Sequence, residues 1–140
     1  MTYLRFAAHP FHLSAERLNG FVRLLVSGQL DLSTAGYLEE SLARLQQEGA
    51  TVIVDLSDVT FMGVVGLRIF VDAARRARST RGVLVIVNCS RPARRIFELT
   101  SKLDLLDAWA VSELFDDDRK WTPVALTPVE PLDASPVSVG

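Results

Sequence analysis

The chain has few of the residues that build metal and redox sites. Its 140 residues include one cysteine, Cys89, and two histidines, His9 and His12. A single thiol cannot form an internal disulfide or a multi-thiolate metal site, so we interpret Cys89 as a small, half-buried apolar residue. His9 and His12 stand three apart on a predicted strand and therefore point to opposite faces of it. The sequence predicts no bound metal and no cofactor.

The chain also lacks a hydrophobic run long enough to cross a membrane. Its longest apolar runs, such as Val83–Val87, fall far short of the roughly 18 residues that a spanning helix needs. No charged and then apolar leader opens the sequence. We therefore expect a soluble, cytoplasmic protein with no membrane insertion.

Motifs of catalysis and of nucleotide binding are absent as well. The segment Gly63–Gly66 reads GVVG, which is too short for a phosphate-binding loop and lacks its lysine. No Ser-His-Asp order with a nucleophile elbow occurs. Asp55 and Asp58 stand three apart without a third ligand nearby, so turn capping is the favoured role. The sequence predicts that the protein is not an enzyme.

Charge is unevenly distributed along the chain, whose formal net charge is −2. Residues 66–102 contain nine Lys or Arg and two Asp or Glu. Residues 103–140 contain two Lys or Arg and eight Asp or Glu. This grouping is compatible with a basic face near an acidic tail, although solvated arginine faces on helices are the favoured interpretation. The isoelectric point is near 5.6 and no aromatic residues interleave the arginines, so no nucleic-acid partner is expected.

The first half of the chain predicts a hairpin and a helix within one compact domain. Leu4–His12 and Phe21–Ser27 are rich in strand-forming residues, with a turn signal at Asn19-Gly20. Apolar residues then recur at helical spacing between positions 35 and 45, and Gly49 ends that helix.

The second half alternates strands and helices. Thr51–Leu56 and Val83–Val87 are short apolar runs typical of central parallel strands covered on both faces. A helical stripe at 67–77 separates them, and Ser90 caps a third helix. A short edge strand at 109–111 and a last helix or turn at 113–121 complete the prediction. The predicted fold is α/β, with a mixed, mostly parallel sheet of four to five strands and about four helices.

The C-terminal segment has a different character. Residues 122–140 hold four of the six prolines and show no amphipathic period. We therefore predict one domain over residues 1–121 and a flexible, proline-containing tail over 122–140.

Three segments resemble, in order and spacing, the STAS domain of bacterial anti-sigma factor antagonists. They are GQLDLSTAGYLEESL at 28–42, VDLSDVTFMGVVGL at 54–67, and a stretch that begins LVIVNCSRPARRIFELT at 84. The resemblance covers about residues 4–121 and implies a STAS-like fold. It also implies binding to an anti-sigma factor that is a serine kinase. In that family the third strand is followed by Asp-Ser-Ser-Gly, whose first serine is phosphorylated to end the interaction.

The chain departs from the family pattern at this switch. The matching segment is GVVG, so Val64 stands at the family's phosphosite position and Val65 replaces the second serine. Valine has no nucleophilic oxygen, so the switch cannot operate there. Ser57 and Thr60 lie earlier in the predicted strand-to-helix loop. There, hydrogen bonding to the turn backbone is favoured over a displaced phosphosite.

Two interpretations of the valines stay open. They are ordinary packing residues of a relative that lost its partner, or they are contacts of a permanently receptive interface, contributing about 1–2 kcal/mol if buried there. The second is favoured because Gly66 leaves room for close backbone approach and Leu67 anchors the helix. Asp31 matches an acidic family position but is equally well explained as a helix N-terminal acid. The predicted partner-binding residues are Asp31, Ser57, Gly63, Val64, Val65, Gly66, Leu67 and Phe70.

The resemblance implies a protein-binding module that engages an anti-sigma factor, or a related kinase-fold protein, without the serine switch. Such a module would regulate transcription indirectly. The alternative is a non-switching structural STAS subunit of a larger signalling or transporter-associated complex, and small-ligand binding is a third class. The oligomeric state stays open, with a homodimer as one option.

Overall fold

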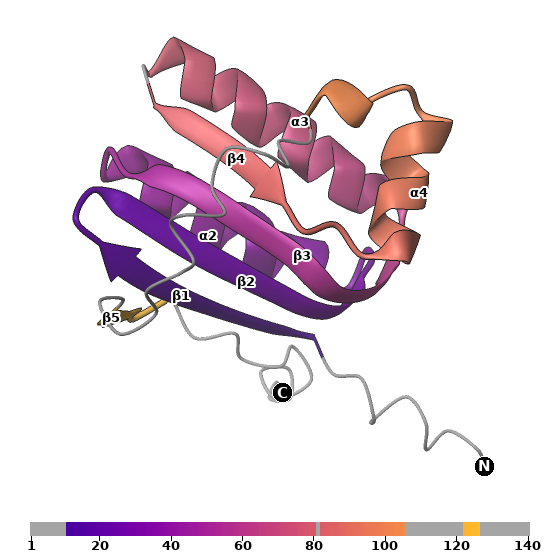
Figure 1. Cartoon of the computed structure of the whole chain (residues 1–140), viewed down its shortest axis with the longest axis horizontal. Coiled ribbons are helices and arrows are strands. Elements are labelled where there is room, and N and C mark those ends of the chain that lie inside the picture. Colours follow the sequence, from indigo (N-terminus) through magenta and orange to yellow (C-terminus); the bar gives the residue numbers. More distant parts are fainter. Residues whose placement is uncertain (1–10, 81, 106–121, 127–140) are drawn as a thin grey trace, which may run out of the picture.

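The chain forms a five-stranded sheet with helices packed against it (Figure 1). The structure, a computed structural model, describes residues 11–80, 82–105 and 122–126. The strands are β1 (His12–Leu18), β2 (Phe21–Leu30), β3 (Thr51–Met62), β4 (Val83–Val87) and β5 (Thr122–Val124). The helices are α2 (Ala35–Gln47), α3 (Val64–Ser79), α4 (Arg91–Leu99) and a 3-10 helix (Leu103–Leu105).

The strand order is β4-β3-β2-β1-β5, so the sheet is mixed. β2, β3 and β4 run parallel, as predicted for strands joined by helices, whereas β1 pairs antiparallel with both β2 and β5. Parallel strands end at the same edge of a sheet. The segments that follow β2 and β3 therefore start next to each other, and this arrangement builds the site described below.

The predicted hairpin is present, but its first strand was placed too early. The turn is Asn19-Gly20, where Asn19 has a φ of 56°, a left-handed conformation that asparagine tolerates. The strand that pairs with β2 is His12–Leu18 and not Leu4–His12. Leu13 and Ala15 face the core in this strand, while Glu16 and Arg17 weaken its strand propensity. Residues 1–10 lie outside the described part of the chain.

β3 is longer than its apolar run suggested. Val52, Ile53 and Val54 are fully buried, which confirms that the strand is covered on both faces at its start. The strand then continues through Met62, and its register with β2 shifts twice. Ser57 therefore lies on the strand, and the loop predicted there is wrong. The continuous apolar run on which the prediction depended ends at Leu56, and the irregular second half of the strand carries no such run.

The main core lies between the sheet and the helices, and a smaller, separate cluster is formed by Ile53 and Val87 with Leu18, Phe21 and Val85. The buried stripe of α2, which includes Leu38 and Leu42, shares the main core with the buried stripe of α3 and with the inward residues of the sheet. α4 begins at Ser90, whose side chain accepts a hydrogen bond from the Ala93 amide at 3.3 Å, as the sequence predicts. Phe97 of α4 is fully buried, so this short helix is anchored to the same core.

The end of the chain differs from the prediction in two respects. The described residues contain three α-helices instead of about four, and the strand and helix predicted at 109–121 lie outside them. Thr122–Val124 form β5 on β1, although the sequence assigned these residues to the flexible tail. Pro123 is compatible with this position because β5 is an edge strand. An Arg44 guanidinium nitrogen also donates to the Ala125 carbonyl at 3.1 Å, so the folded unit extends past residue 121.

Gly66 is required where α3 approaches the sheet. A β-carbon at this position would lie 2.7 Å from Leu30 Cδ2 and 2.9 Å from Leu30 Cγ, and Leu30 is fully buried. We expect Gly66→Ala to destabilise the fold by about 1–2 kcal/mol, because the overpacking outweighs the gain in helix propensity. Urea-induced unfolding measures this change.

Gly36 offers the matched control for this prediction. It lies on α2, is exposed, and has no atom within 4 Å of an added β-carbon. Gly36→Ala is therefore expected to stabilise the fold by up to about 1 kcal/mol. Equal effects of the two substitutions would contradict the close packing at Gly66.

Candidate functional site

The carboxyl ends of β2 and β3 create an open depression on the surface. The Gly63 amide donates to the Leu30 carbonyl at 3.0 Å, which holds the start of α3 against the loop that leads into α2. The depression has a volume of about 580 Å³. Its lining residues come from these two segments and are Asp31, Leu32, Ser33, Gly63, Val64 and Val65. The sequence predicted four of these six as partner-binding residues.

The loop before α2 is held by hydrogen bonds from side chain to backbone. The Ser33 amide and the Ser33 hydroxyl both donate to Asp31 Oδ1, at 2.9 and 2.7 Å. The Asp31 amide donates to Thr34 Oγ1 at 3.0 Å, and that hydroxyl donates to the Gln29 carbonyl at 2.8 Å. Neither hydroxyl caps α2 directly. Asp31 thus shapes the turn that presents Leu32 and Ser33.

The Asp31 carboxyl is ionised at neutral pH. The hydrogen bond from the Ser33 hydroxyl lowers its pKa, partial burial opposes this effect, and the bonds from the Ser33 and Thr34 backbone add to it. The depression therefore carries one fixed negative charge at its edge. A further negative group placed beside it would be repelled.

Exposed apolar side chains lie in the depression and next to it. Leu32 is 85% exposed and Val64 is 66% exposed, and both line it. Phe61 is 49% exposed, and its ring edge would lie 3.6 Å from a β-carbon on Gly63. We call Leu32, Phe61 and Val64 the apolar patch. It holds three of the five large apolar side chains that are exposed in the described part of the chain. A concentration of this kind is typical of a protein-binding surface.

Three of the predicted partner-binding residues are buried in the structure. Gly66 is buried, Leu67 is 6% exposed and Phe70 is fully buried. They lie on the side of α3 that faces the core, where they support Val64 and Val65 from below. Their helical spacing already placed them in the apolar stripe, and their contact with a partner stays a prediction.

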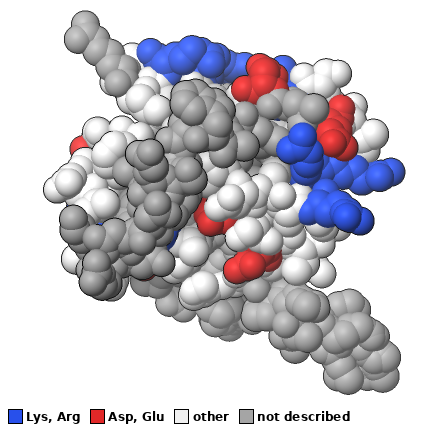
Figure 2. Space-filling model, viewed as in Figure 1, with Lys and Arg blue, Asp and Glu red and all other residues white. Residues whose placement is uncertain are grey.

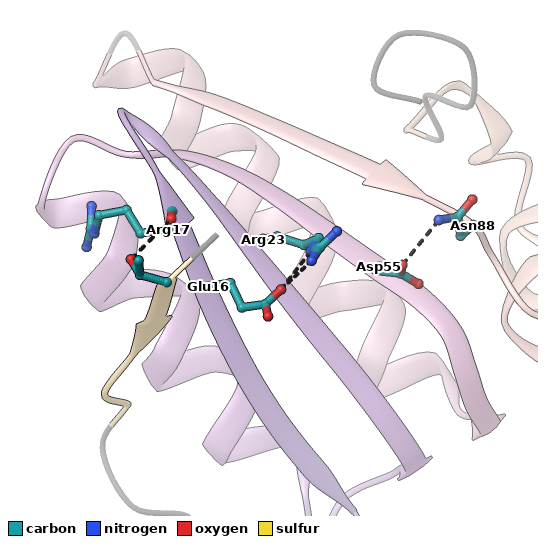
Figure 3. Close-up of polar contacts among 6 residues, drawn as sticks. Glu16, Arg17, Arg23, Asp55 and Asn88 are labelled. Carbon is teal, nitrogen blue, oxygen red and sulfur yellow. Dashed lines mark hydrogen bonds and ion pairs between the residues drawn. The ribbon is translucent and has the colours of Figure 1, made fainter. Parts of the chain in front are cut away.

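Ser57 also lies away from the depression. It is exposed on β3, and its amide donates to Asp55 Oδ1 at 2.8 Å. Asp55 Oδ2 accepts a second hydrogen bond from Asn88 Nδ2 at 3.1 Å, across to the segment after β4 (Figure 3). The Asp55 carboxylate, in the middle of β3, therefore links this strand to the segment after β4 and does not cap a turn at a strand end, which is the role that the sequence predicted. No group of three or more possible metal ligands occurs in residues 11–80, 82–105 and 122–126.

Figure 3 also shows an ion pair on the two N-terminal strands. Arg23 Nε donates to Glu16 Oε1 at 3.0 Å, and Arg23 is only 8% exposed. Glu16 and Arg23 are register partners on β1 and β2, so the ion pair joins the two strands across the sheet. Neither residue lines the depression, so we assign the pair a structural role.

Basic side chains lie on α3 and α4. Figure 2 shows Lys and Arg residues gathered, with acidic residues among them, at the end of the molecule where Figure 1 places α4. Arg91, Arg94 and Arg95 are exposed on this helix, and Arg94 pairs with Glu98 at 3.2 Å. Arg68 is exposed on α3, one turn after Val64. A cation therefore stands next to the apolar patch.

Sequence reasoning missed Leu32, Ser33 and Phe61. The position of Leu32 was a usable signal, because a large apolar residue between Asp31 and Ser33 in a polar turn has no core to enter. Phe61 gave no such signal. Its exposure depends on the register shifts in β3, which the sequence does not reveal.

A family model described as the STAS domain matches residues 12–117 of the chain. The chain belongs to the STAS domain family. A relative, the anti-sigma-B factor antagonist of Bacillus subtilis (strain 168), is 32% identical over 92 residues, which cover 66% of this chain and 84% of the relative. The anti-sigma-B factor antagonist of Staphylococcus epidermidis is 34% identical over 87 residues, which cover 61% of this chain and 81% of the relative.

Solved structures agree with this family membership. The crystal structure of an anti-sigma factor antagonist from Mycobacterium paratuberculosis has a TM-score of 0.65 and 25% identity, covering 74% of this chain and 89% of that one. The anti-sigma factor antagonist SpoIIAA in its unphosphorylated form has a TM-score of 0.63 and 20% identity, and the match covers 79% of this chain and 95% of that one. At this identity the match shows the fold alone. A Bacillus SpoIIAA structure in the phosphorylated form has a TM-score of 0.59. The STAS-like α/β fold predicted from the sequence is confirmed.

No helix in the described part of this STAS chain is both long and apolar enough to span a membrane.

Proposed function

We propose that this STAS chain is an anti-sigma factor antagonist-like module that binds an anti-sigma factor of the serine-kinase type. The apolar patch carries the proposal, because it concentrates exposed Leu32, Phe61 and Val64 at one end of the parallel strands. Relatives named anti-sigma-B factor antagonists support the choice of partner. Binding would occupy the anti-sigma factor in the cytoplasm, so that its sigma factor is released, with no chemical step on this chain.

The proposed interface is permanently receptive at α3. Val64 is the first residue of that helix, after Gly63 in extended conformation. We assign it to the position at which the family carries its phosphorylated serine. An apolar side chain there gains free energy when a partner covers it, up to about 1.5–3 kcal/mol for full burial of a valine or leucine. Phosphorylation cannot reverse that contact, because Val64 and Val65 have no acceptor oxygen.

The energetics of such an interface depend on a few central contacts. Leu32 and Val64 face the same depression from two different elements, so one apolar side chain of the partner could pack against both. Arg68 stands beside this contact and suits an acidic group on the partner. The partner that fits best therefore presents an apolar side chain with a carboxylate nearby.

Affinity capture tests the proposal. The full chain serves as bait in an extract of the cells that express it, and retained proteins are identified by mass spectrometry. We expect an anti-sigma factor with an ATP-binding kinase domain among them. A folded bait that retains no anti-sigma factor would contradict the proposal. Retention of only scaffold or transporter proteins would favour the structural alternative instead.

A further inference from the structure

The depression lies between two helices that carry charges of opposite sign. α2 and α3 begin on its two sides and pack against each other, and the buried Gln46 side chain of α2 donates to the Ala73 carbonyl of α3 at 2.8 Å. The first exposed charges of α2 are Glu39 and Glu40, whereas the first exposed charge of α3 is Arg68. The apolar patch therefore has an acidic side and a basic side.

The acidic side starts in the depression itself. Asp31 lines the depression, and its carboxylate accepts two hydrogen bonds within its own turn, so this charge is held in place. Glu39 and Glu40 follow on α2 and form no ion pair with any described residue. Arg44 is the one cation of α2, and it donates to the carbonyl of Ala125, the residue after β5, at 3.1 Å. The acidic side chains of α2 are therefore available to a partner.

The basic side is formed by α3 and continues on α4. Arg68 is exposed one turn after Val64, and it has no ion-pair partner among the residues that the structure describes. Arg91 and Arg95 are exposed on α4, which contacts α3. Figure 2 shows cations along the upper edge of the molecule, where Figure 1 places α3, and at the end where it places α4. Positive charge thus gathers on the α3 and α4 side of the depression.

We infer that this division of charge orients the partner on the apolar patch. The partner places a cationic group over Asp31 and Glu40 and an anionic group over Arg68, on either side of the apolar side chain that enters the depression. The inference rests on the proposed function for the identity of the partner and adds its charge pattern and its orientation. The reversed orientation would bring like charges together on both sides, which disfavours it.

The charges lie close enough to the depression to act on an approaching partner. Arg68 follows Val64, the first residue of α3, by four positions, and Glu40 follows Ala35, the first residue of α2, by five. These separations correspond to rises of about 6 and 7.5 Å along a helix. Both fall within the Debye length of about 8–10 Å at moderate salt. Arg78 lies ten positions beyond Arg68, about 15 Å further along α3, and is outside this range.

Association kinetics of two charge reversals test the orientation. Glu40→Lys and Arg68→Glu change the net charge of the chain in opposite directions, and both residues are exposed, so the fold should be preserved. Each variant is mixed in a stopped-flow instrument with the purified anti-sigma factor that the wild-type chain captures. At low salt we expect both to associate about 3- to 10-fold more slowly than the wild type, because each loses an attraction at the rim. At about 1 M salt the three chains should associate alike.

Opposite responses of the two variants would reveal attraction by net charge alone. A partner drawn to the chain only as an anion would associate faster with Glu40→Lys and more slowly with Arg68→Glu. That result, or no effect of either reversal at low salt, overturns the inference and leaves the proposed function standing. Arg78→Glu is the matched control, since it is exposed on the same helix but distant from the depression, and its association rate should stay within about 2-fold of the wild type. A loss as large as that of Arg68→Glu would also overturn the inference.

The identity of the captured protein separates the inference from the proposed function. A protein that the wild type retains and Val64→Asp loses, but that is not an anti-sigma factor, refutes the function. The association rates of that protein with Glu40→Lys and Arg68→Glu then still decide the inference, by the same criteria. A folded chain that captures no protein through the apolar patch refutes both.

Discussion

Phe70→Ala is expected to destabilise the fold by about 3–5 kcal/mol, as large truncations in well-packed cores do. Phe70 is fully buried in α3, and its ring lies 6.2 Å from that of Phe97 in α4, at 34°. The substitution would leave a cavity between the two helices and remove an aromatic pair worth about 0.5–1.5 kcal/mol beyond area burial. Unfolding in urea, followed by circular dichroism, measures the loss as a lower transition midpoint.

Leu99→Ala is the control for this experiment. Leu99 ends α4 and is 68% exposed, so its truncation should change stability by no more than about 0.5 kcal/mol. Similar stabilities of Phe70→Ala and the wild type would show that Phe70 is not a core residue.

Val64→Asp is expected to weaken binding of the anti-sigma factor at least about 100-fold, because a carboxylate would be desolvated at the centre of an apolar contact. Val64 is 66% exposed and opens α3. An acidic residue in the first turn of a helix is favourable by about 0.3–1 kcal/mol, so the fold itself should be preserved. Titration of the captured and purified anti-sigma factor with each variant gives the change in Kd.

Val83→Asp is the matched control for Val64→Asp. Val83 is 48% exposed and begins β4, so it lies at the opposite end of the parallel strands from the depression. The same substitution there adds the same charge without touching the apolar patch, and its Kd should stay within a few-fold of the wild type. A greater loss of affinity with Val83→Asp than with Val64→Asp would indicate that the interface lies on the β4 side of the molecule.

Much of the fold could be predicted from the sequence, because local patterns and tertiary packing agree there. The continuous apolar run at the start of β3 is typical of a buried strand and the stripe of α3 has helical spacing, and both elements occur in the structure. The second half of β3 could not be predicted in this way. Its register shifts against β2 disturb the alternation, and Ser57 and Asp58 give a stretch of strand the composition of a loop.

Only some residues of the candidate site could be predicted from the sequence, for a similar reason. Asp31, Gly63 and Val64 could be placed because they sit in segments with a recognisable pattern. Leu32 carried a usable signal as a large apolar residue in a polar turn, but Ser33 could not be placed, since its role arises only when the ends of β2 and β3 bring two loops together. Strand order and register determine that meeting, and a single sequence does not encode them in any local pattern.

Hydrogen–deuterium exchange of the full chain, with and without the purified anti-sigma factor, tests the central claim most directly. The account predicts that binding slows amide exchange in the two segments that form the depression, 29–34 and 61–68, while exchange in β4 and α4 is unchanged. Protection confined to residues 83–99, or no protection at a concentration that saturates binding, would contradict it. In that case the apolar patch of Leu32, Phe61 and Val64 would not be the surface through which this STAS domain binds.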